Sequence, residues 1–143
     1  MSGLVFVDTN VLLYAVDEAD QQKQGSAQAW REWLWQTRRG RLSFQVLQEF
    51  YSNVCNKWPK AKDAARQEIE DLLRWKPVSV NGVLLQSAWQ LQDRYGFSFW
   101  DSLIVAAAKV SACGFLLSED FQSGQNIDGL LIVNPFRTQP DQI

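Results

Sequence analysis

Short apolar runs alternate with longer amphipathic stretches along the chain. Residues 4–7, 115–117 and 130–133 are continuous apolar runs, which are typical of strands buried on both faces of a parallel sheet. Residues 42–44 and 77–80 predict two further short strands. Because strands alternate with helical patterns, the sequence predicts an α/β fold with a mostly parallel sheet.

Apolar residues at helical spacing predict the helices that connect these strands. The predicted helices lie around residues 10–16, 22–38, 46–54, 60–74, 82–95 and 98–110. We expect Gly40 and Gly114 to end the second and the last of them, because glycine readily adopts the left-handed backbone that follows a helix. The last helix is almost wholly apolar, so we expect it to be buried against the sheet. On the helix at 82–95, we expect Val83 on the buried side.

The whole chain, residues 1–143, is expected to form one domain, because no repeat or Pro/Gly/Ser-rich linker divides it. The polar tail from residue 137 is expected to be flexible. No apolar run approaches the roughly 20 residues of a membrane span, and the N-terminus lacks the basic region of a signal peptide. Cys55 and Cys113 are expected to be buried thiols. These features predict a cytoplasmic protein.

Histidine is absent from the chain, and only two cysteines are present. This composition excludes Ser-His-Asp and Cys-His catalysis and leaves too few ligands for a structural zinc site. Any catalysis must therefore rest on carboxylates, hydroxyls, lysines or arginines. The net charge of -2 indicates no global positive field, although local patches and bound cations can reverse the field near a site.

Four acidic residues border the predicted strands. Asp8 directly follows the first strand, and Asp120 lies shortly after the strand at 115–117. Asp101 lies in the first turn of the apolar helix, and Glu49 lies on the helix that follows the short second strand. Because ligands bind at the carboxyl ends of parallel strands, the sequence allows these four acids to converge there.

Each acid also has a plainer interpretation. Asp8 can cap the following helix, and Asp101 stands three residues after Ser98 in the spacing of a capping box. Glu49 can be an ordinary surface acid, and Asp120 can be a turn residue. Together, however, four close carboxylates repel one another, and Mg²⁺ or Mn²⁺ would relieve that repulsion. Such a site is suited to the hydrolysis of a phosphodiester bond.

The segments around these acids resemble the PIN domain family and, within it, the VapC-type toxin ribonucleases of toxin–antitoxin pairs. The resemblance rests on residues 5–14, 48–50, 99–108 and 116–121. It implies a three-layer α/β/α PIN-like fold with a mostly parallel five-stranded sheet. It also implies an endoribonuclease that depends on Mg²⁺ or Mn²⁺.

Carried onto this chain, the resemblance implies that four acids act as catalytic residues and metal ligands. These acids are Asp8, Glu49, Asp101 and Asp120. Thr9 and Asn10 would support the first acid, and Ser118 would orient the last. Glu119 remains an alternative to Asp120 as the fourth acid.

The resemblance further implies an RNA substrate, a homodimer and a small antitoxin partner that covers the acidic site. Candidate phosphate contacts are Arg38, Arg39, Arg41 and Lys57. The alternative function is a catalytically silent PIN-like module that binds RNA or protein.

Seven tryptophans are many for a chain of this length, and three of them crowd one predicted helix. Trp30 and Trp33 fit a core stripe, whereas Trp35 points elsewhere. An exposed aromatic at that position suits a protein contact or stacking on an RNA base. From the sequence we favour the protein contact.

Overall fold

The structure is a computed structural model that describes residues 3–143; Met1 and Ser2 of the predicted domain lie outside this range. A five-stranded sheet forms its centre, with the strands in the order β2-β1-β3-β5-β4. The strands are β1 (Val5–Val7), β2 (Gly40–Arg41), β3 (Phe115–Leu117), β4 (Asn126–Ile127) and β5 (Leu130–Val133). Only β4 is antiparallel to its neighbour. The predicted α/β fold with a mostly parallel five-stranded sheet is confirmed.

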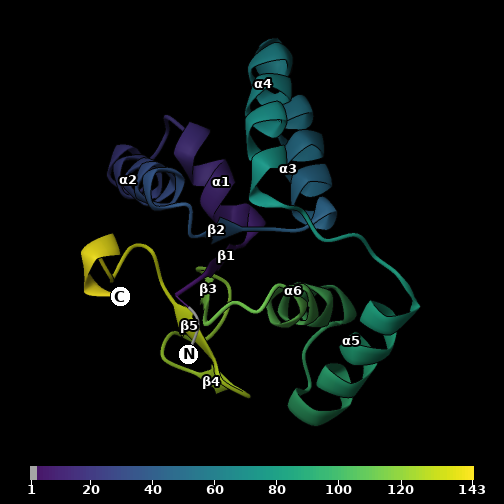
Figure 1. Cartoon of the computed structure of the whole chain (residues 1–143). Coiled ribbons are helices and arrows are strands. Elements are labelled where there is room, and N and C mark those ends of the chain that lie inside the picture. Colours follow the sequence, from purple (N-terminus) through teal and green to yellow (C-terminus); the bar gives the residue numbers. More distant parts are fainter. Residues whose placement is uncertain (1–2) are drawn as a thin grey trace.

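Helices cover both faces of this sheet. The α-helices are α1 (Thr9–Val16), α2 (Gln21–Thr37), α3 (Phe44–Lys57), α4 (Lys62–Leu72), α5 (Gly82–Tyr95) and α6 (Phe99–Val110). Short 3-10 turns span Pro59–Ala61, Leu73–Trp75 and Pro140–Gln142. Figure 1 shows α1 and α2 on one side of the sheet and α5 and α6 on the other, with α3 and α4 projecting as a pair.

The core forms where these layers meet. Both β1 and β3 bury apolar side chains, and in α6 seven consecutive residues from Ser102 to Ala108 are buried. The prediction of a buried apolar helix is therefore confirmed for most of α6. Two expected core positions are wrong: Trp100, at the start of α6, is 64% exposed, and Val83, at the start of α5, is 70% exposed. Each is the second residue of its helix.

The second predicted strand lies two residues earlier than expected, at Gly40–Arg41. The hydroxyl of Ser43 accepts a hydrogen bond from the backbone N–H of Val46 (3.3 Å) and caps α3, so Phe44 is already helical. The predicted strand at 77–80 is wrong as well, because Val78 forms only an isolated bridge with Ser43. The sequence also missed β4, whose two residues carry too little pattern to be recognised.

Neither glycine that was expected to end a helix is the left-handed residue at that helix end. The left-handed residue after α2 is Arg38 (φ 59°), and the one after α6 is Ala112 (φ 58°). Gly40 lies inside β2, where a Cβ atom would stand 2.8 Å from ring atoms of Trp75. That glycine is required by close packing rather than by a helix end.

The C-terminal segment contacts α2. The indole N–H of Trp30 donates hydrogen bonds to the carbonyls of Pro135 (3.1 Å) and Thr138 (3.0 Å). The flexibility of the tail stays a prediction. Cys113 is buried, whereas Cys55 is half-buried, and both thiols are free. Burial raises the pKa of Cys113 to about 12, so this thiol is unreactive at neutral pH.

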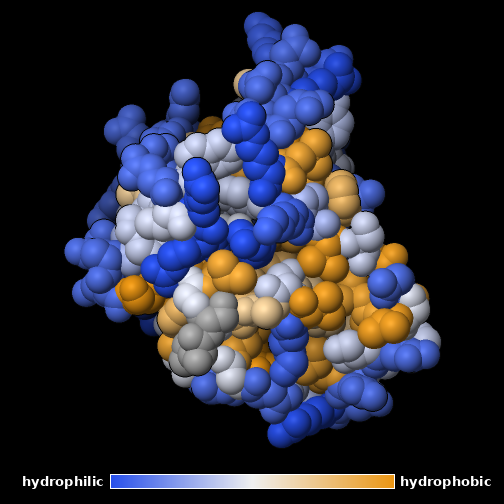
Figure 2. All heavy atoms as spheres, in the orientation of Figure 1, coloured by the Kyte–Doolittle hydropathy of each residue, from blue (hydrophilic) through white to orange (hydrophobic). Residues whose placement is uncertain are grey.

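Several large apolar side chains are exposed around α5 and α6. They are Val80, Val83, Trp89, Trp100 and Val110. Figure 2 shows apolar residues gathered on this side of the molecule, whereas the region of α4 is hydrophilic. Within residues 3–143, no helix combines the length and the apolar character that crossing a membrane requires.

Candidate functional site

The carboxyl ends of β1 and β3 lie side by side, because the strands pair in parallel with Val7 opposite Leu117. Asp8 follows Val7, and its backbone N–H donates to the carbonyl of Leu117 (3.0 Å). Ser118 and Asp120 follow Leu117 along the chain. The parallel register therefore brings two predicted site segments together at one edge of the sheet, although more than 100 residues separate them in sequence.

Asp8 both caps α1 and faces the neighbouring strand. Its Oδ1 accepts a hydrogen bond from the Thr9 backbone N–H (2.8 Å), which confirms the predicted cap. Its Oδ2 accepts from the Ser118 hydroxyl (2.8 Å) and from the Asn10 side-chain amide (3.2 Å). The helix cap and the contacts with Ser118 and Asn10 thus use different oxygens of one carboxylate.

Burial raises the pKa of Asp8 from 3.8 to about 6. The hydrogen bonds from Ser118 and Thr9 work in the opposite direction, because they stabilise the ionised form. The negative charges of Asp120 and Glu49 raise the pKa further. Asp8 is therefore a carboxylate held in an environment that would favour a nearby positive charge.

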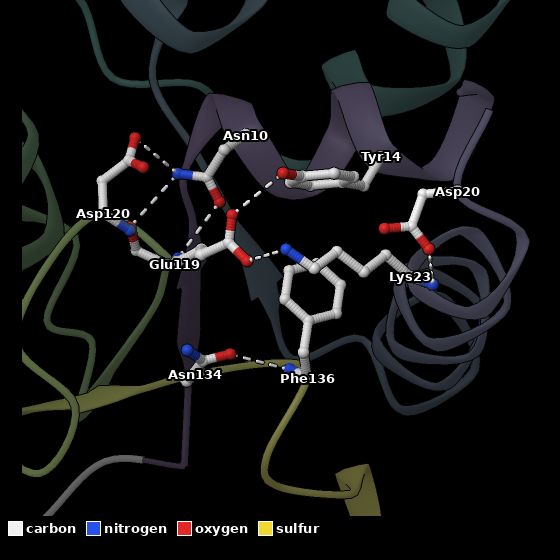
Figure 3. A network of polar contacts seen from close by, with 9 residues as sticks. Asn10, Tyr14, Asp20, Lys23, Glu119, Asp120, Asn134 and Phe136 are labelled. Carbon is white, nitrogen blue, oxygen red and sulfur yellow. Dashed lines mark hydrogen bonds and ion pairs between the residues drawn. The ribbon is translucent and has the colours of Figure 1, made fainter. Parts of the chain in front are cut away.

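Asn10 joins the two strand ends through its side-chain amide, and Figure 3 shows its contacts with Glu119 and Asp120 after β3. Its Nδ2 lies within hydrogen-bond distance of Asp8 Oδ2 (3.2 Å), Ser118 Oγ (3.2 Å) and Asp120 Oδ2 (3.1 Å). The Glu119 backbone N–H donates to Asn10 Oδ1 (3.2 Å), which fixes the orientation of the amide. An amide nitrogen has only two hydrogens, so the three acceptors must share them.

The structure distinguishes the two adjacent acids after β3. The carboxylate of Glu119 accepts a hydrogen bond from the Tyr14 hydroxyl (3.0 Å) and forms an ion pair with Lys23. The Lys23 ammonium also lies over the rings of Tyr14 (4.8 Å) and Phe136 (5.0 Å). Asp120 instead points toward Asn10 and away from this cluster (Figure 3). Geometry thus favours Asp120 over Glu119 as the acid that faces Asp8.

The remaining two acids border the same edge. The Asp101 backbone N–H donates to the Ser98 hydroxyl (3.1 Å), as the capping interpretation predicts. Burial raises the pKa of the Asp101 carboxyl, and the charge of Asp120 adds to the effect. Glu49 is exposed on α3, and its Oε1 accepts a hydrogen bond from the Thr9 hydroxyl (3.3 Å).

The four acids lack opposite charges. Throughout residues 3–143, no lysine or arginine forms an ion pair with any of them. In the same part of the chain, no three acidic or cysteine side chains form a compact metal-binding cluster. The acids thus surround one edge without touching one another. Their oxygen donors suit Mg²⁺ or Mn²⁺, and the raised pKa values show the repulsion and burial that a cation would offset.

The candidate phosphate contacts are not beside these acids. The arginines of 38–41 lie where β2 begins, at the amino edge of the sheet. The Arg39 guanidinium lies over the Trp33 ring (4.5 Å). Lys57 is the last residue of α3 and lies near the ring of Trp58 (5.8 Å). The structure therefore separates Lys57 from the three arginines.

Comparison with known proteins identifies the fold. The sequence profile of the PIN domain matches residues 5–123. A toxin–antitoxin complex from Klebsiella pneumoniae is similar with a TM-score of 0.64 and 16% identity, covering 92% of this chain and 97% of that chain. No curated protein sequence matches significantly.

Two further solved structures share the fold. One is VapC20 from Mycobacterium tuberculosis, described as a sarcin-ricin loop cleaving toxin, with a TM-score of 0.60, 20% identity and coverage of 78% of this chain and 86% of that chain. The other is VapBC2 from Rickettsia felis bound to a promoter DNA fragment, with a TM-score of 0.60, 17% identity and coverage of 90% and 96%. At these identities the likeness establishes the fold alone.

Proposed function

Because this chain belongs to the PIN domain family, we propose that it is a metal-dependent endoribonuclease and the toxin of a toxin–antitoxin pair. The observation that carries this proposal is the set of four acids at the carboxyl edge of the sheet that have no ion-pair partner among residues 3–143. The names of two structural neighbours support it, since one is a toxin–antitoxin complex and another is a sarcin-ricin loop cleaving toxin.

The proposed site uses three aspartates and one glutamate. Asp8, Asp101 and Asp120 would hold one or two Mg²⁺ or Mn²⁺ ions, and Glu49 would complete or orient the site. When bound, the ion would supply positive charge to the scissile phosphate and make the attacking water more acidic. The products would carry a 5′-phosphate and a 3′-hydroxyl, in keeping with the family resemblance.

Polar neighbours position these acids. The Ser118 hydroxyl donates to Asp8 (2.8 Å) and accepts from the Asp120 backbone N–H (3.1 Å), so it orients both strand ends rather than Asp120 alone. Asn10 holds the carboxylates of Asp8 and Asp120 from between them. Such hydrogen bonds to metal ligands commonly fix their geometry and affinity.

A second polar cluster holds the neighbouring acid and would keep it away from a bound metal. Lys23 and Tyr14 both contact the Glu119 carboxylate, which neutralises its charge. Asp120 is thereby the acid of this pair that remains available to a cation. The Thr9 hydroxyl orients Glu49 in a comparable way.

The proposal includes protein partners and a cytoplasmic setting. A small antitoxin would cover the acidic edge, and a second copy of the chain would form a homodimer. The exposed apolar side chains around α5 and α6 support a protein contact, because contiguous apolar surface on a soluble protein commonly marks an interface.

RNA cleavage by the wild type and by Asp8→Asn tests the proposal. Both proteins are incubated with total cellular RNA in Mg²⁺, in Mn²⁺ and in EDTA, and fragment ends are mapped. We expect discrete 5′-phosphate fragments from the wild type only, with none in EDTA. Cleavage that survives both EDTA and the substitution would show that the proposed site is wrong.

A catalytically silent binding module is the second candidate. It is favoured by one observation: within residues 3–143, no three acids form a compact metal cluster. RNA left intact by a folded, antitoxin-free wild type under every metal condition would support this candidate and would overturn the nuclease.

A further inference from the structure

A second candidate site lies at the amino edge of the sheet. A cavity of about 580 Å³ opens there, lined by Trp35, Arg38, Arg41, Arg74, Trp75 and Lys76. We refer to it as the basic cavity. Its lining comes from the end of α2 with β2, and from the 3-10 turn Leu73–Trp75 with the residue that follows. Figure 2 shows strongly hydrophilic side chains around the position of β2.

The basic cavity and the acids lie at opposite edges of the sheet. The Val5 backbone N–H donates to the Arg39 carbonyl (2.8 Å), so the lining segment borders the start of β1. Asp8 stands at the other end of the same strand. The charge of Arg41 also acts on Cys113, which precedes β3. Arg41 therefore faces the amino edge as well.

The positive charges of the cavity have no acidic partners. Four of its six lining residues are cations, and none of the six is acidic. As far as residues 3–143 are concerned, none of these four cations forms an ion pair. Cations are favoured at helix C-termini, which accounts for Arg38 after α2 and for Arg74 and Lys76 at the end of the 3-10 turn, but not for Arg41 inside β2. The chain as a whole is acidic, with a net charge of -2.

The cavity is held in place by its own backbone. The Arg41 guanidinium donates to the carbonyls of Arg38 (3.3 Å) and Gly40 (2.7 Å). The Trp75 ring packs directly on Gly40, leaving no room for a side chain there. Arg38 (φ 59°) and Lys76 (φ 56°) both adopt the left-handed backbone that commonly ends a helix, so the two lining segments change direction at these cations.

An aromatic surface accompanies these cations. Trp35 is half-buried, and the guanidinium groups of Arg31 (4.7 Å) and Arg74 (6.0 Å) lie near its ring. Arg31 is already paired with Glu68, whereas Arg74 has no ion-pair partner in the described part of the chain. Guanidinium groups bind phosphate through paired N–H donors, and an indole ring stacks on bases.

We propose that the basic cavity binds a nucleotide, with its phosphate on Arg38, Arg74 and Lys76 and its base against Trp35. The nucleotide belongs to an RNA strand or is free. If the nucleotide belongs to an RNA strand, the proposal rests on the proposed ribonuclease function. The cavity would then bind a part of the RNA substrate that lies away from the four acids. From the sequence we favoured a protein contact for Trp35, and the cations around it now favour stacking on a base. A protein contact is less suited here, because none of the large exposed apolar side chains of residues 3–143 lines the cavity.

Binding of a fluorescein-labelled 20-nucleotide single-stranded RNA, measured by anisotropy in EDTA, tests the cavity without any cleavage. Arg74→Glu removes a lining cation, and Arg137→Glu makes the same charge change at an exposed residue outside the cavity. We expect the Kd to rise about tenfold for Arg74→Glu and less than about threefold for Arg137→Glu. Lys76→Gln provides a second variant if Arg74→Glu does not fold.

The outcomes separate the possible occupants. Displacement of the RNA by AMP identifies a free nucleotide as an occupant, and no displacement confines the cavity to the RNA strand. Equal Kd values for Arg74→Glu, Lys76→Gln and Arg137→Glu would overturn the proposal. The proposal would also be overturned if Arg74→Glu weakened the binding of a labelled hexaglutamate peptide but not the binding of RNA, because the cavity would then be a protein site. Since EDTA prevents metal-dependent cleavage, failure of the nuclease and failure of the cavity are seen independently.

Discussion

The two edges of the central sheet carry opposite charges. At the carboxyl edge, Asp8 and Asp120 meet around Asn10, with no cation paired to them among the described residues. At the amino edge, Arg38, Arg41, Arg74 and Lys76 line one cavity that contains no acid. The difference shows that a chain with a net charge of only -2 can hold two strongly charged and opposite sites.

The two edges are also built differently. The acidic edge is organised by hydrogen bonds between short polar side chains, so small changes there should alter chemistry more than folding. The basic edge is organised by packing of Trp75 on Gly40 and by backbone carbonyls that hold Arg41. Changes to that packing should alter folding first.

The largest effect is expected from the two neighbouring acids at the carboxyl edge. Asp120→Asn should lower the rate of RNA cleavage by at least ~100-fold, because a bound metal contributes several kcal/mol to such reactions. Glu119→Gln should lower it by less than about tenfold, because that carboxylate already pairs with Lys23. Single-turnover cleavage rates measure both. The reverse order would assign the fourth acid to Glu119.

Breaking the packing of the amino edge should come next. Gly40→Ala places a Cβ atom 2.8 Å from the Trp75 ring and should cost about 1–3 kcal/mol of folding free energy. Gly25→Ala is the matched control, since a Cβ there meets nothing within 4 Å and should add about 0.5–1 kcal/mol to helix stability. Urea unfolding of both variants gives the comparison. Equal stability would mean that Trp75 moves freely at this edge.

Removing the amide at the centre of the acidic edge should affect metal binding rather than folding. Asn10→Ala should raise the half-saturating Mn²⁺ concentration for cleavage about tenfold, because it removes the hydrogen bonds that orient two proposed ligands. Asn56→Ala, an exposed change on α3, serves as the control. An unchanged metal requirement in Asn10→Ala would exclude a positioning role for Asn10.

The smallest effect concerns the stability of the acidic edge without metal. The native pKa of Asp8 is raised from 3.8 to about 6, so ionising Asp8 destabilises the fold above that pH and protonation removes the cost below it. Asp8→Asn keeps a residue that caps helix α1 well, although it places a second side-chain amide next to that of Asn10. In EDTA we therefore expect it to be about 1 kcal/mol more stable than the wild type at pH 8.

The pH series supplies the check on that last prediction. The advantage of Asp8→Asn in urea unfolding should shrink as the pH falls through about 6, where Asp8 takes up a proton. The stability advantage should vanish near pH 3.8, the pKa that Asp8 has in the unfolded chain. An advantage that instead grew at low pH would show that burial does not destabilise the ionised carboxylate.

The sequence determined the features that depend on residues close together in the chain. Apolar runs predicted β1, β3 and β5, and helical periodicity predicted every long helix. The caps at Asp8 and Ser98 were also predicted, because a cap involves residues within three positions of one another. The acids that follow strands could also be recognised, because each lies close to its strand in the chain. Parallel strands then place their carboxyl ends at one edge of the sheet.

Tertiary structure alone decided which partners each charged group meets. Asn10 reaches Asp120 across 110 positions, and Lys23 reaches Glu119 across 96. The basic cavity joins the end of α2 to the turn after α4, and nothing local marks Arg74 or Lys76 as belonging to it. Such contacts depend on strand register and helix packing, which are set by the burial of the whole core rather than by any short segment.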